Sequence, residues 1–412
     1  MSDALCTRRQ KQVVLSGTAP SSESVDLDCV IVEILSRLPA KSLLRFRCVC
    51  KAWRALISDP YFIRKHLSCI NTKISTSYSL LIRDKIFQST EYEAILKFLS
   101  HDGPLPSRRL DFPVLDRLVI VSRILIVGSC NGLICLILDF HHFLMEESFT
   151  FMLWNPCTGE YRVLPQPPVH SSRECFFGFG YDSTTDDYKV ILGNSYKPGY
   201  EYVVVFMLKR GSWRKIERLN RYFGVRRVGC LVNETLHWVL KEKEDGRLIT
   251  SRIVSFDLAE EKFHEIPFPY PPDPNDNGFL IAEVGNPCNC LTLVFQTVYS
   301  DVAGNLKLWV MKEYGVKESW TEVMNISPEV MDEDENIPLE FLYDGEPYTY
   351  KACISDNGEI LMQLEPIGTL ALYNPREKKY RTVMGYPDYM YETAPYIETL
   401  VSPVTGSTGA SV

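Results

Sequence analysis

Aromatic residues recur at nearly regular intervals along most of this chain. In each of five units an aromatic residue is followed three positions later by an aliphatic one, and the units lie 50 to 60 residues apart. Four units have a further aromatic residue seven positions before the first. Such a period is typical of repeat architectures, in which one unit cannot bury both of its faces alone. The pairs are Tyr161/Leu164, Trp213/Ile216, Phe263/Ile266, Trp320/Val323 and Tyr380/Val383, and the preceding aromatic residues are Trp154, Phe206, Phe256 and Tyr373.

Each repeat predicts a β-hairpin. The first aromatic residue would end one strand, a polar turn would follow, and the second would begin the returning strand. The turns NPCTGE, LKRGS, DLAEEK and NPREKK contain the Asn, Pro, Gly and charged residues that turns use. In the fourth unit Glu313 stands at the expected aromatic position, and Trp309, four residues earlier, predicts a longer turn there.

Two strand-like apolar runs before each hairpin complete a unit of four strands. Sheets of this kind cover one another when they are arranged around an axis, so the sequence predicts a β-propeller-like domain. A sixth unit shared between Tyr78–Ile82 and Tyr396–Val401 would join the two ends of this domain. A β-sandwich with decorated edges is the competing architecture.

Two amphipathic helical segments precede the repeats. The first presents one wide apolar face and ends at Pro39, because the residue before a proline disfavours the helical region. The second is predicted to run on past Val49, with one apolar stripe for about three turns, until Asp59-Pro60 stops it. So small a segment cannot bury these faces by itself, which implies a partner protein; the alternative is a helical cap on the chain's own C-terminal domain.

The run LPAKSLLRFRCVCKAWRALISDP closely resembles the F-box, the adaptor-binding module of cullin-based ubiquitin ligases, and the resemblance covers roughly residues 26–67. It implies that these helices interlock with a Skp-type adaptor. Asp26-Leu27 stands where F-boxes usually open with a Leu-Pro pair, which places the first adaptor contact in question. Aliphatic anchors with one large ring are the usual components of a binding hot spot. The resemblance places adaptor contacts on Val30, Ile34, Leu38, Pro39, Leu43, Phe46, Val49, Cys50 and Trp53.

The remainder resembles the F-box-associated domain of plant F-box proteins, a group that includes many F-box/kelch-repeat proteins and lies near the pollen S-locus F-box proteins. The resemblance covers nearly everything from residue 76 to 402 and implies that this domain recruits the protein to be ubiquitinated. The phrases that carry it are VGSCNGLICL (127–136), LWNPCTGEYRVLP (153–165), GFGYDSTTDDYKVI (178–191), LHWVL (236–240), SFDLAEEKFHEIP (255–267) and LWVMKEYGVKESW (308–320).

An enzyme is the rival class, and its best candidate is Gly128-Ser129-Cys130-Asn131-Gly132, with the spacing of a nucleophile elbow. An elbow needs a strand before it and a helix after it. Both flanks predict strands here, so a tight Asn-Gly hairpin turn is favoured. The sequence therefore predicts no catalytic residue.

Metal and cofactor sites are not predicted either. His141-His142 and Cys288-Asn289-Cys290 lack further ligands at metal-like spacing, and Cys48 and Cys50 would face different ways in a helix.

For the protein target, the acidic run 331–336 is a candidate docking patch. Tyr196, Tyr200 and Tyr222 are candidate contacts because tyrosine is favoured in recognition surfaces.

Charge and the ends of the chain limit the remaining choices. A net charge of -8 gives no global attraction for nucleic acid or an anionic membrane. The N-terminus lacks the apolar core of a signal peptide, so the 13 cysteines are expected to be reduced in cytoplasm or nucleus. The predicted domains are a disordered segment 1–24, an F-box 25–68, the β domain 76–402 and a flexible tail 403–412.

Together these features predict an α+β multidomain protein with a small all-α F-box followed by an all-β propeller-like domain. The expected function is the substrate-recognition subunit of an SCF-type ubiquitin ligase, which joins a protein target to the Skp-type adaptor and, through it, to the cullin-RING ligase. Such a subunit acts by proximity and is not an enzyme. The alternatives are a pollen S-locus receptor for S-ribonucleases in self-incompatibility, or an interaction module outside any ligase.

Overall fold

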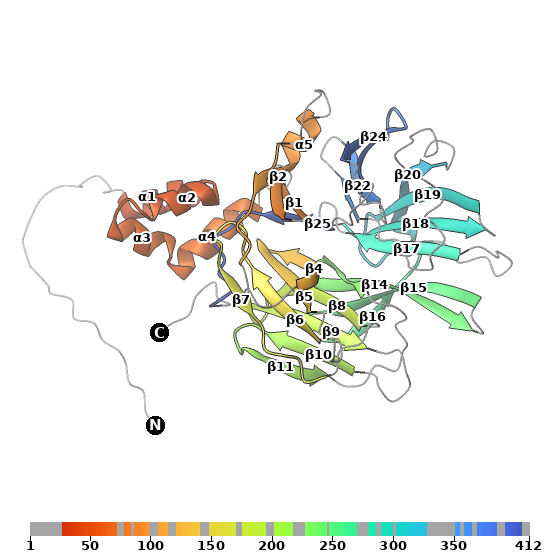
Figure 1. The fold of residues 1–412 in the computed structure, drawn as a ribbon, viewed down its shortest axis with the longest axis horizontal. Helices are drawn as coiled ribbons and strands as arrows, with labels where there is room; N and C mark the ends of the chain where they lie inside the picture. The colour runs from red at the N-terminus through yellow and green to blue at the C-terminus, as the bar shows by residue number, and fades with distance from the viewer. Residues whose placement is uncertain are drawn as a thin grey trace, which may run out of the picture.

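The structure is a computed structural model with a helical module beside a larger body of β-sheets (Figure 1). It describes residues 27–71, 78–83, 86–98, 106–113, 121–140, 148–169, 175–194, 202–216, 227–244, 247–269, 279–285, 290–299, 302–327, 351–354, 358–364, 369–384 and 392–405. The helices precede the sheets in the chain, as the sequence predicts. The fold class is therefore confirmed.

The helical module consists of four short helices: α1 (Leu27–Leu35), α2 (Ala40–Phe46), α3 (Lys51–Ile57) and α4 (Pro60–Asn71). The prediction of one continuous helix past Val49 is wrong, because residues 47–50 form a turn between α2 and α3. Cys50 ends that turn, because its Sγ accepts a hydrogen bond from the Trp53 backbone N–H at 3.4 Å. An N-cap of this kind starts a new helix and interrupts the apparent stripe.

Six sheets follow, and we number them as blades. Blades 1 to 5 contain the five repeats, and blade 6 combines the two ends of the β domain. The strands are as follows: blade 1, β4 (Val121–Cys130), β5 (Leu133–Phe140), β6 (Ser148–Trp154), β7 (Tyr161–Val163); blade 2, β8 (Cys175–Asp182), β9 (Asp187–Asn194), β10 (Tyr202–Met207), β11 (Ser212–Ile216), with β12 (Arg227–Val228) beside β8; blade 3, β13 (Cys230–Val232), β14 (Thr235–Glu244), β15 (Arg247–Asp257), β16 (Phe263–Ile266); blade 4, β17 (Phe279–Gly285), β18 (Thr292–Tyr299), β19 (Val302–Met311), β20 (Trp320–Ile326); blade 5, β21 (Lys351–Ile354), β22 (Ile360–Leu364), β23 (Thr369–Asn374), β24 (Lys379–Met384); blade 6, β25 (Glu392–Ile397), β1 (Tyr78–Arg83), β2 (Phe87–Glu91), β3 (Arg108–Arg109).

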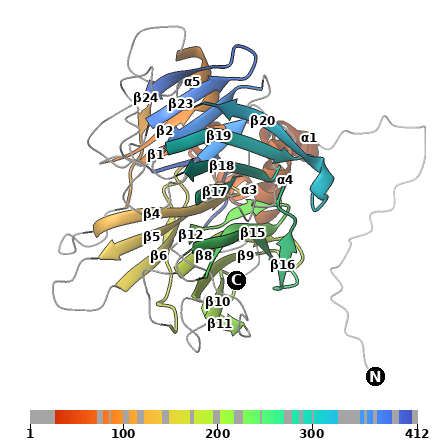
Figure 2. The same cartoon turned by 90° about the vertical axis from the view of Figure 1, so that its right-hand side faces the viewer.

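Blade 6 closes the ring. Strand β25 pairs antiparallel with β1, with Tyr78 opposite Ile397 and Arg83 opposite Glu392. The predicted closure is thus confirmed, although its C-terminal strand begins four residues earlier than expected. A short helix, α5 (Tyr92–Phe98), lies between β2 and β3. The first strands of neighbouring blades contact one another in the order β25, β4, β8, β13, β17 and β21, and the blades fan out in Figure 2.

The aromatic repeat is a pair of residues facing each other across the outer hairpin of a blade. The first member of each pair is buried, which explains why the chain repeats a large ring at this position. The predicted register is confirmed in four blades: Trp154 lies opposite Tyr161, Phe206 opposite Trp213, Phe256 opposite Phe263 and Tyr373 opposite Tyr380.

Blade 4 has the longer turn that its sequence predicts. Residues 312–319, including a 3-10 helix at Lys317–Ser319, join β19 to β20. Trp320 therefore lies opposite Met311, while Trp309 lies opposite Glu322. The predicted longer turn is confirmed, and it begins one residue earlier than the run EYGVKES.

The outer strands also tie neighbouring blades together. The Trp213 indole N–H of blade 2 donates to the Pro165 carbonyl of blade 1 at 2.7 Å, and the Trp320 indole of blade 4 donates to the Pro267 carbonyl of blade 3 at 2.9 Å. Each proline directly follows the aliphatic member of a repeat pair. The repeat therefore encodes contacts between blades as well as hairpins within them.

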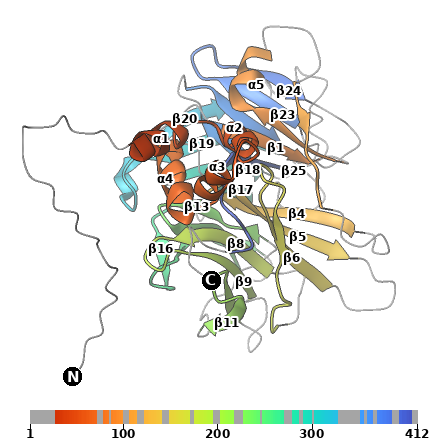
Figure 3. The same cartoon turned by 90° about the vertical axis from the view of Figure 1, so that its left-hand side faces the viewer.

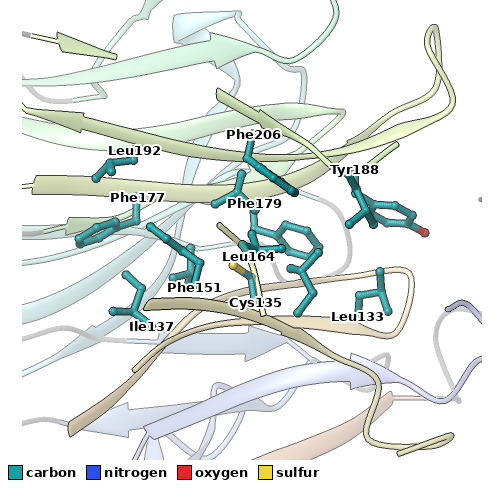
Figure 4. Close-up of a cluster of buried hydrophobic side chains, with 14 of the residues drawn as sticks. Leu133, Cys135, Ile137, Phe151, Leu164, Phe177, Phe179, Tyr188, Leu192 and Phe206 are labelled. Atoms are coloured by element: carbon teal, nitrogen blue, oxygen red, sulfur yellow. The ribbon is translucent and has the colours of Figure 1, made fainter. Parts of the chain in front are cut away.

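A large buried cluster lies between blades 1 and 2 (Figure 4). Residues from β5 and β6, such as Ile137 and Phe151, meet residues from β8, β9 and β10, such as Phe177 and Phe206. Leu67 of the helical module also belongs to this cluster. One apolar core is thus shared by both parts of the protein.

Gly128–Cys130 end strand β4 and Asn131-Gly132 form a hairpin turn, as favoured over the nucleophile elbow. Strand β5 follows it directly, and Cys130 lies opposite Leu133. Asn131 and Gly132 both have positive φ, the geometry of a tight two-residue hairpin loop. Burial raises the pKa of the Cys130 thiol to about 12, so it stays protonated at neutral pH.

A buried histidine joins blades 3 and 4. The ring of His237 lies 2.6 Å from the Tyr314 hydroxyl through Nε2 and 3.3 Å from the Cys230 carbonyl through Nδ1. A neutral ring satisfies both contacts, with Nδ1 donating and Nε2 accepting. Burial lowers the pKa of His237 to about 4, so the folded protein holds the neutral form.

Acidification is therefore expected to weaken the fold through His237. The unfolded chain binds the proton near pH 6.5 but the folded chain only near pH 4, so stability falls progressively across this interval and levels off below it. The expected loss from this residue is on the order of 3 kcal/mol. The free energy of unfolding in urea is measured for the wild type and for His237→Gln from pH 7.5 to 4. The difference between the two proteins should change with pH by this amount. A difference that stays constant would contradict the role assigned to His237.

Candidate adaptor-binding face

Four large apolar side chains of the helical module are exposed. Val30 and Ile34 lie one turn apart on α1 and are 36% and 57% exposed. Val49 in the turn between α2 and α3 is 65% exposed, and Tyr61 at the start of α4 is 62% exposed. The chain's own propeller, which lies behind the module in Figure 3, leaves these side chains exposed.

The predicted contacts beneath this surface are partly buried. Leu38, Phe46 and Trp53 pack against the core of the module, and the rings of Phe46 and Trp53 meet edge to face at 5.3 Å. Pro39 and Cys50 are exposed. These five residues thus border the surface or support it.

Leu43 requires a correction. It is fully buried among Leu35, Ile57 and Phe62, so in this structure it holds the helices together and offers no atoms to a partner. The sequence could not separate these roles, since an apolar residue at helical spacing looks the same on either face of a thin module.

Tyr61 and the helix that presents it were not among the predicted contacts. The signal was present in the sequence, because Asp59 is a good N-cap and Pro60 suits the first helical position. In the structure the Asp59 carboxylate accepts from the Tyr61 N–H at 2.8 Å and the Phe62 N–H at 3.2 Å. Asp59-Pro60 therefore stops one helix and starts the next.

Helix α4 joins the module to the rest of the protein. Leu67 is buried in the cluster of blades 1 and 2, with Ile63 and Ile70 packed against it. On its other side, His66 is buried and its Nε2 lies 3.0 Å from the Leu38 carbonyl. Burial lowers the pKa of His66, which keeps this ring neutral in the interior.

The C-terminal segment, residues 398–405, lies between the helices and the propeller. Leu400 is part of the helical core, beside which Cys157 of blade 1 also packs. Glu398 forms ion pairs with Lys41 of α2 at 2.7 Å and with Arg108 of β3 at 3.3 Å. This segment therefore contacts both parts at once.

Asn155 of blade 1 fixes the C-terminal segment in place. It is buried, and its Nδ2 donates to the Thr399 carbonyl at 3.1 Å and the Val401 carbonyl at 2.7 Å. Its Oδ1 accepts from the N–H groups of Cys157 and Thr158 in its own turn. One side chain thus holds both the hairpin turn and the C-terminal segment.

Two further contacts complete this attachment. The Thr399 hydroxyl donates to the Asn131 carbonyl at 2.8 Å, and a Cβ at Gly132 would lie 2.3 Å from that hydroxyl oxygen. The Arg162 guanidinium donates to the carbonyls of Val404 and Leu208.

Pro403 is buried, so the predicted flexible tail starts too early at 403; residues 406–412 lie outside the described residues.

The candidate target contacts and most of the candidate metal ligands fall in other parts of the chain. Tyr196, Tyr200, Tyr222, the acidic run 331–336, His141-His142 and Cys288-Asn289 all lie outside the described residues. In the described part of the chain, no group of three or more His, Cys, Asp or Glu is arranged to hold a metal ion. Across the same residues, no helix has the length and apolarity to cross a membrane.

Comparison with known proteins identifies both parts. The F-box domain model matches residues 28–65, and the model of the F-box associated beta propeller domain matches residues 107–384. The F-box/kelch-repeat protein At3g23880 of Arabidopsis thaliana is 29% identical over 391 residues, covering 90% of this chain and 94% of that protein. The F-box protein CPR1 of the same plant is 32% identical over 335 residues, covering 72% of each. The chain belongs to the F-box proteins that carry an F-box associated beta propeller domain.

Proposed function

We propose that this protein is the substrate-recognition subunit of an SCF-type ubiquitin ligase in the cytoplasm or nucleus. Its F-box binds a Skp-type adaptor, which links it to a cullin-RING ligase, and its propeller holds a protein target for ubiquitination and degradation. The observation that carries the proposal is the set of exposed apolar side chains, Val30, Ile34, Val49 and Tyr61, on a module attached to a propeller. Exposed apolar groups bordered by a partly buried tryptophan suit a protein interface.

The chemistry proposed for the protein itself is binding alone. Holding a target beside the ubiquitin-charged enzyme raises the effective concentration of the target lysine. The shared core around Leu67 and the ion pair between Lys41 and Glu398 support this role, because they restrict how the propeller turns relative to the F-box. A fixed orientation favours presentation of the target at a constant distance from the ligase.

Adaptor binding is expected to fall at least 30-fold in the double variant Ile34→Asp/Val49→Asp, about 2 kcal/mol. Both side chains are exposed, so the variant removes surface contacts and leaves the helical core intact. Truncating Trp53 and Leu38 would be less informative, because both pack against that core. Equilibrium binding of the purified full chain to a Skp-type adaptor measures the effect.

The chain offers a matched control on the propeller. Tyr161 and Val163 of β7 are 42% and 41% exposed, so Tyr161→Asp/Val163→Asp makes the same chemical change on a similarly exposed apolar pair. This control should keep the wild-type affinity. No binding by the wild type would favour an interaction module outside any ligase, and equal losses in both variants would remove the assignment of this face.

A further inference from the structure

The helical module that contains the F-box has a charge opposite to the rest of the protein. Residues 27–71 contain eight Lys and Arg and three Asp and Glu, a net charge of +5. Since the whole chain carries -8, the remaining residues carry -13. The charge is therefore divided unequally, with a positive F-box and a negative remainder.

Three carboxylates in and beside the F-box are already engaged. Glu33 pairs with Lys65 and with Arg37, the second at 3.6 Å, and Asp59 accepts the backbone N–H groups that begin α4. Glu398 from the C-terminal segment takes Lys41. These contacts neutralise the cations on the side of the module that faces α4 and the propeller.

Three exposed cations lie around the turn that exposes Val49, besides Arg47 of the turn itself, which donates to the Ser58 hydroxyl at 2.8 Å. Arg45 of α2 and Lys51 and Arg54 of α3 are all exposed. Among the described residues, none of the three forms an ion pair. An exposed apolar side chain with several unpaired cations beside it forms a positively charged surface that is complementary to a negatively charged partner.

Helix stability does not explain all three. Arg45 and Arg54 lie in the last turns of their helices, where a cation is favourable. Lys51 is the first residue of α3, where the helix dipole disfavours a positive charge. Its position is therefore better explained by a partner than by the fold.

We propose that Arg45, Lys51 and Arg54 form a cationic rim around Val49 that docks on a carboxylate-rich face of the Skp-type adaptor. This inference rests on the proposed function and adds the chemistry of the partner surface. The rim attracts the acidic partner over a long range, and the apolar side chains hold it after contact. The negative remainder of the chain repels an acidic partner, which favours approach through the F-box. The same -13 charge opposes docking on nucleic acid or an anionic membrane.

The test is the association rate of the full chain with the adaptor at increasing salt. The variant Arg45→Glu/Lys51→Glu/Arg54→Glu is expected to associate about 10-fold or more slowly at low ionic strength, because steering raises association rates by roughly 10 to 1,000-fold. The difference should largely vanish near 1 M salt, where the screening length is about 3 Å. The dissociation rate should change less than the association rate.

A control variant separates this rim from net charge alone. Lys312→Glu/Lys317→Glu/Arg376→Glu changes the total charge equally at three exposed positions in the outer turns of blades 4 and 5, and it should keep most of the wild-type rate. The neutral variant Arg45→Gln/Lys51→Gln/Arg54→Gln should fall between the wild type and the charge reversal.

The two proposals fail in different ways. A wild type that does not bind the adaptor at any salt overturns the proposed function and this inference with it. A wild type that binds with a salt-independent association rate, or a control that slows as much as the rim variant, overturns the inference alone. Loss of binding to vesicles of phosphatidylserine in the rim variant, with unchanged adaptor kinetics, also overturns it.

Discussion

Replacing Asn155 with alanine is expected to destabilise the protein by about 4 kcal/mol and to release the C-terminal segment from blade 1. The buried amide makes four hydrogen bonds, two to the carbonyls of Thr399 and Val401 and two from its own turn. Each is worth roughly 1 kcal/mol, and removing the side chain leaves buried partners unsatisfied. Urea unfolding measures the stability, and limited proteolysis near residue 400 measures the release.

Two companion variants separate the turn from the attachment. Asn374 occupies the equivalent turn of blade 5, where its Oδ1 accepts from the N–H groups of Arg376 and Glu377. Both bonds are exposed to solvent, so Asn374→Ala tests the turn and should cost only about 1 kcal/mol in total. Asn155→Asp keeps the oxygen that accepts from the turn, but it has no N–H group to donate to the carbonyls of Thr399 and Val401. Asp serves well at Asp257 of blade 3, which has the same turn. If Asn155→Asp were as stable as the wild type, the attachment would contribute nothing.

Release of the C-terminal segment should also loosen the F-box. Leu400 would leave the helical core and Glu398 would no longer hold Lys41 against Arg108. Helix α4 would still anchor the module through Leu67. We therefore expect a wider range of F-box orientations in solution scattering rather than separate domains.

The hairpins could be predicted from sequence because their information is local. Trp154 and Tyr161 are seven residues apart, and a turn of known chemistry fixes which residues face each other. The same rule located the longer turn of blade 4 from the absence of an aromatic residue at Glu313. The rule does not give Met311 as the residue opposite Trp320, because a turn of eight residues no longer dictates which residues of the two strands face each other.

The helical module was harder to predict at the level of single residues. The apolar stripe from Phe46 to Trp53 suggested a continuous helix, and the cap at Cys50 that breaks it involves a residue type seldom used for capping. The assignment of Leu43 to the binding face failed because periodicity identifies apolar faces but not which face is covered. Long-range packing decides that, through residues such as Leu400 that lie far away in the sequence.

Replacing Lys189 with methionine is expected to cost about 3–5 kcal/mol, the usual result of removing one partner from a buried ion pair. Lys189 of β9 is buried, and its Nζ lies 2.9 Å from the Asp182 carboxylate, 3.0 Å from Glu261 and 2.5 Å from the Leu258 carbonyl. Asp182 belongs to blade 2, whereas Leu258 and Glu261 belong to the outer turn of blade 3. One ammonium group therefore joins two blades, and its loss leaves a buried carboxylate.

The pH dependence of this variant identifies the cause of its instability. Burial opposes ionisation of Asp182, but hydrogen bonds from Lys189 and Thr185 outweigh it and hold the pKa below the ordinary value. Without Lys189 the burial effect dominates, so the folded-state pKa should rise above the unfolded one. The penalty of Lys189→Met should then shrink as the pH falls from 7 towards 4, because a protonated Asp182 is no longer a buried charge.

Adding Asp182→Asn to Lys189→Met should likewise reduce the loss of stability, and it should do so at neutral pH. The double variant Lys189→Met/Asp182→Asn removes both charges and should recover about half of the loss, since a buried pair replaced as a whole costs less than a broken one. Lys262→Met is the surface control, because Lys262 and Glu260 form an exposed pair whose loss should cost less than about 1 kcal/mol. A penalty for Lys189→Met that stays constant with pH and is unchanged by Asp182→Asn would mean that packing of the lysine side chain, rather than its charge, holds blades 2 and 3 together.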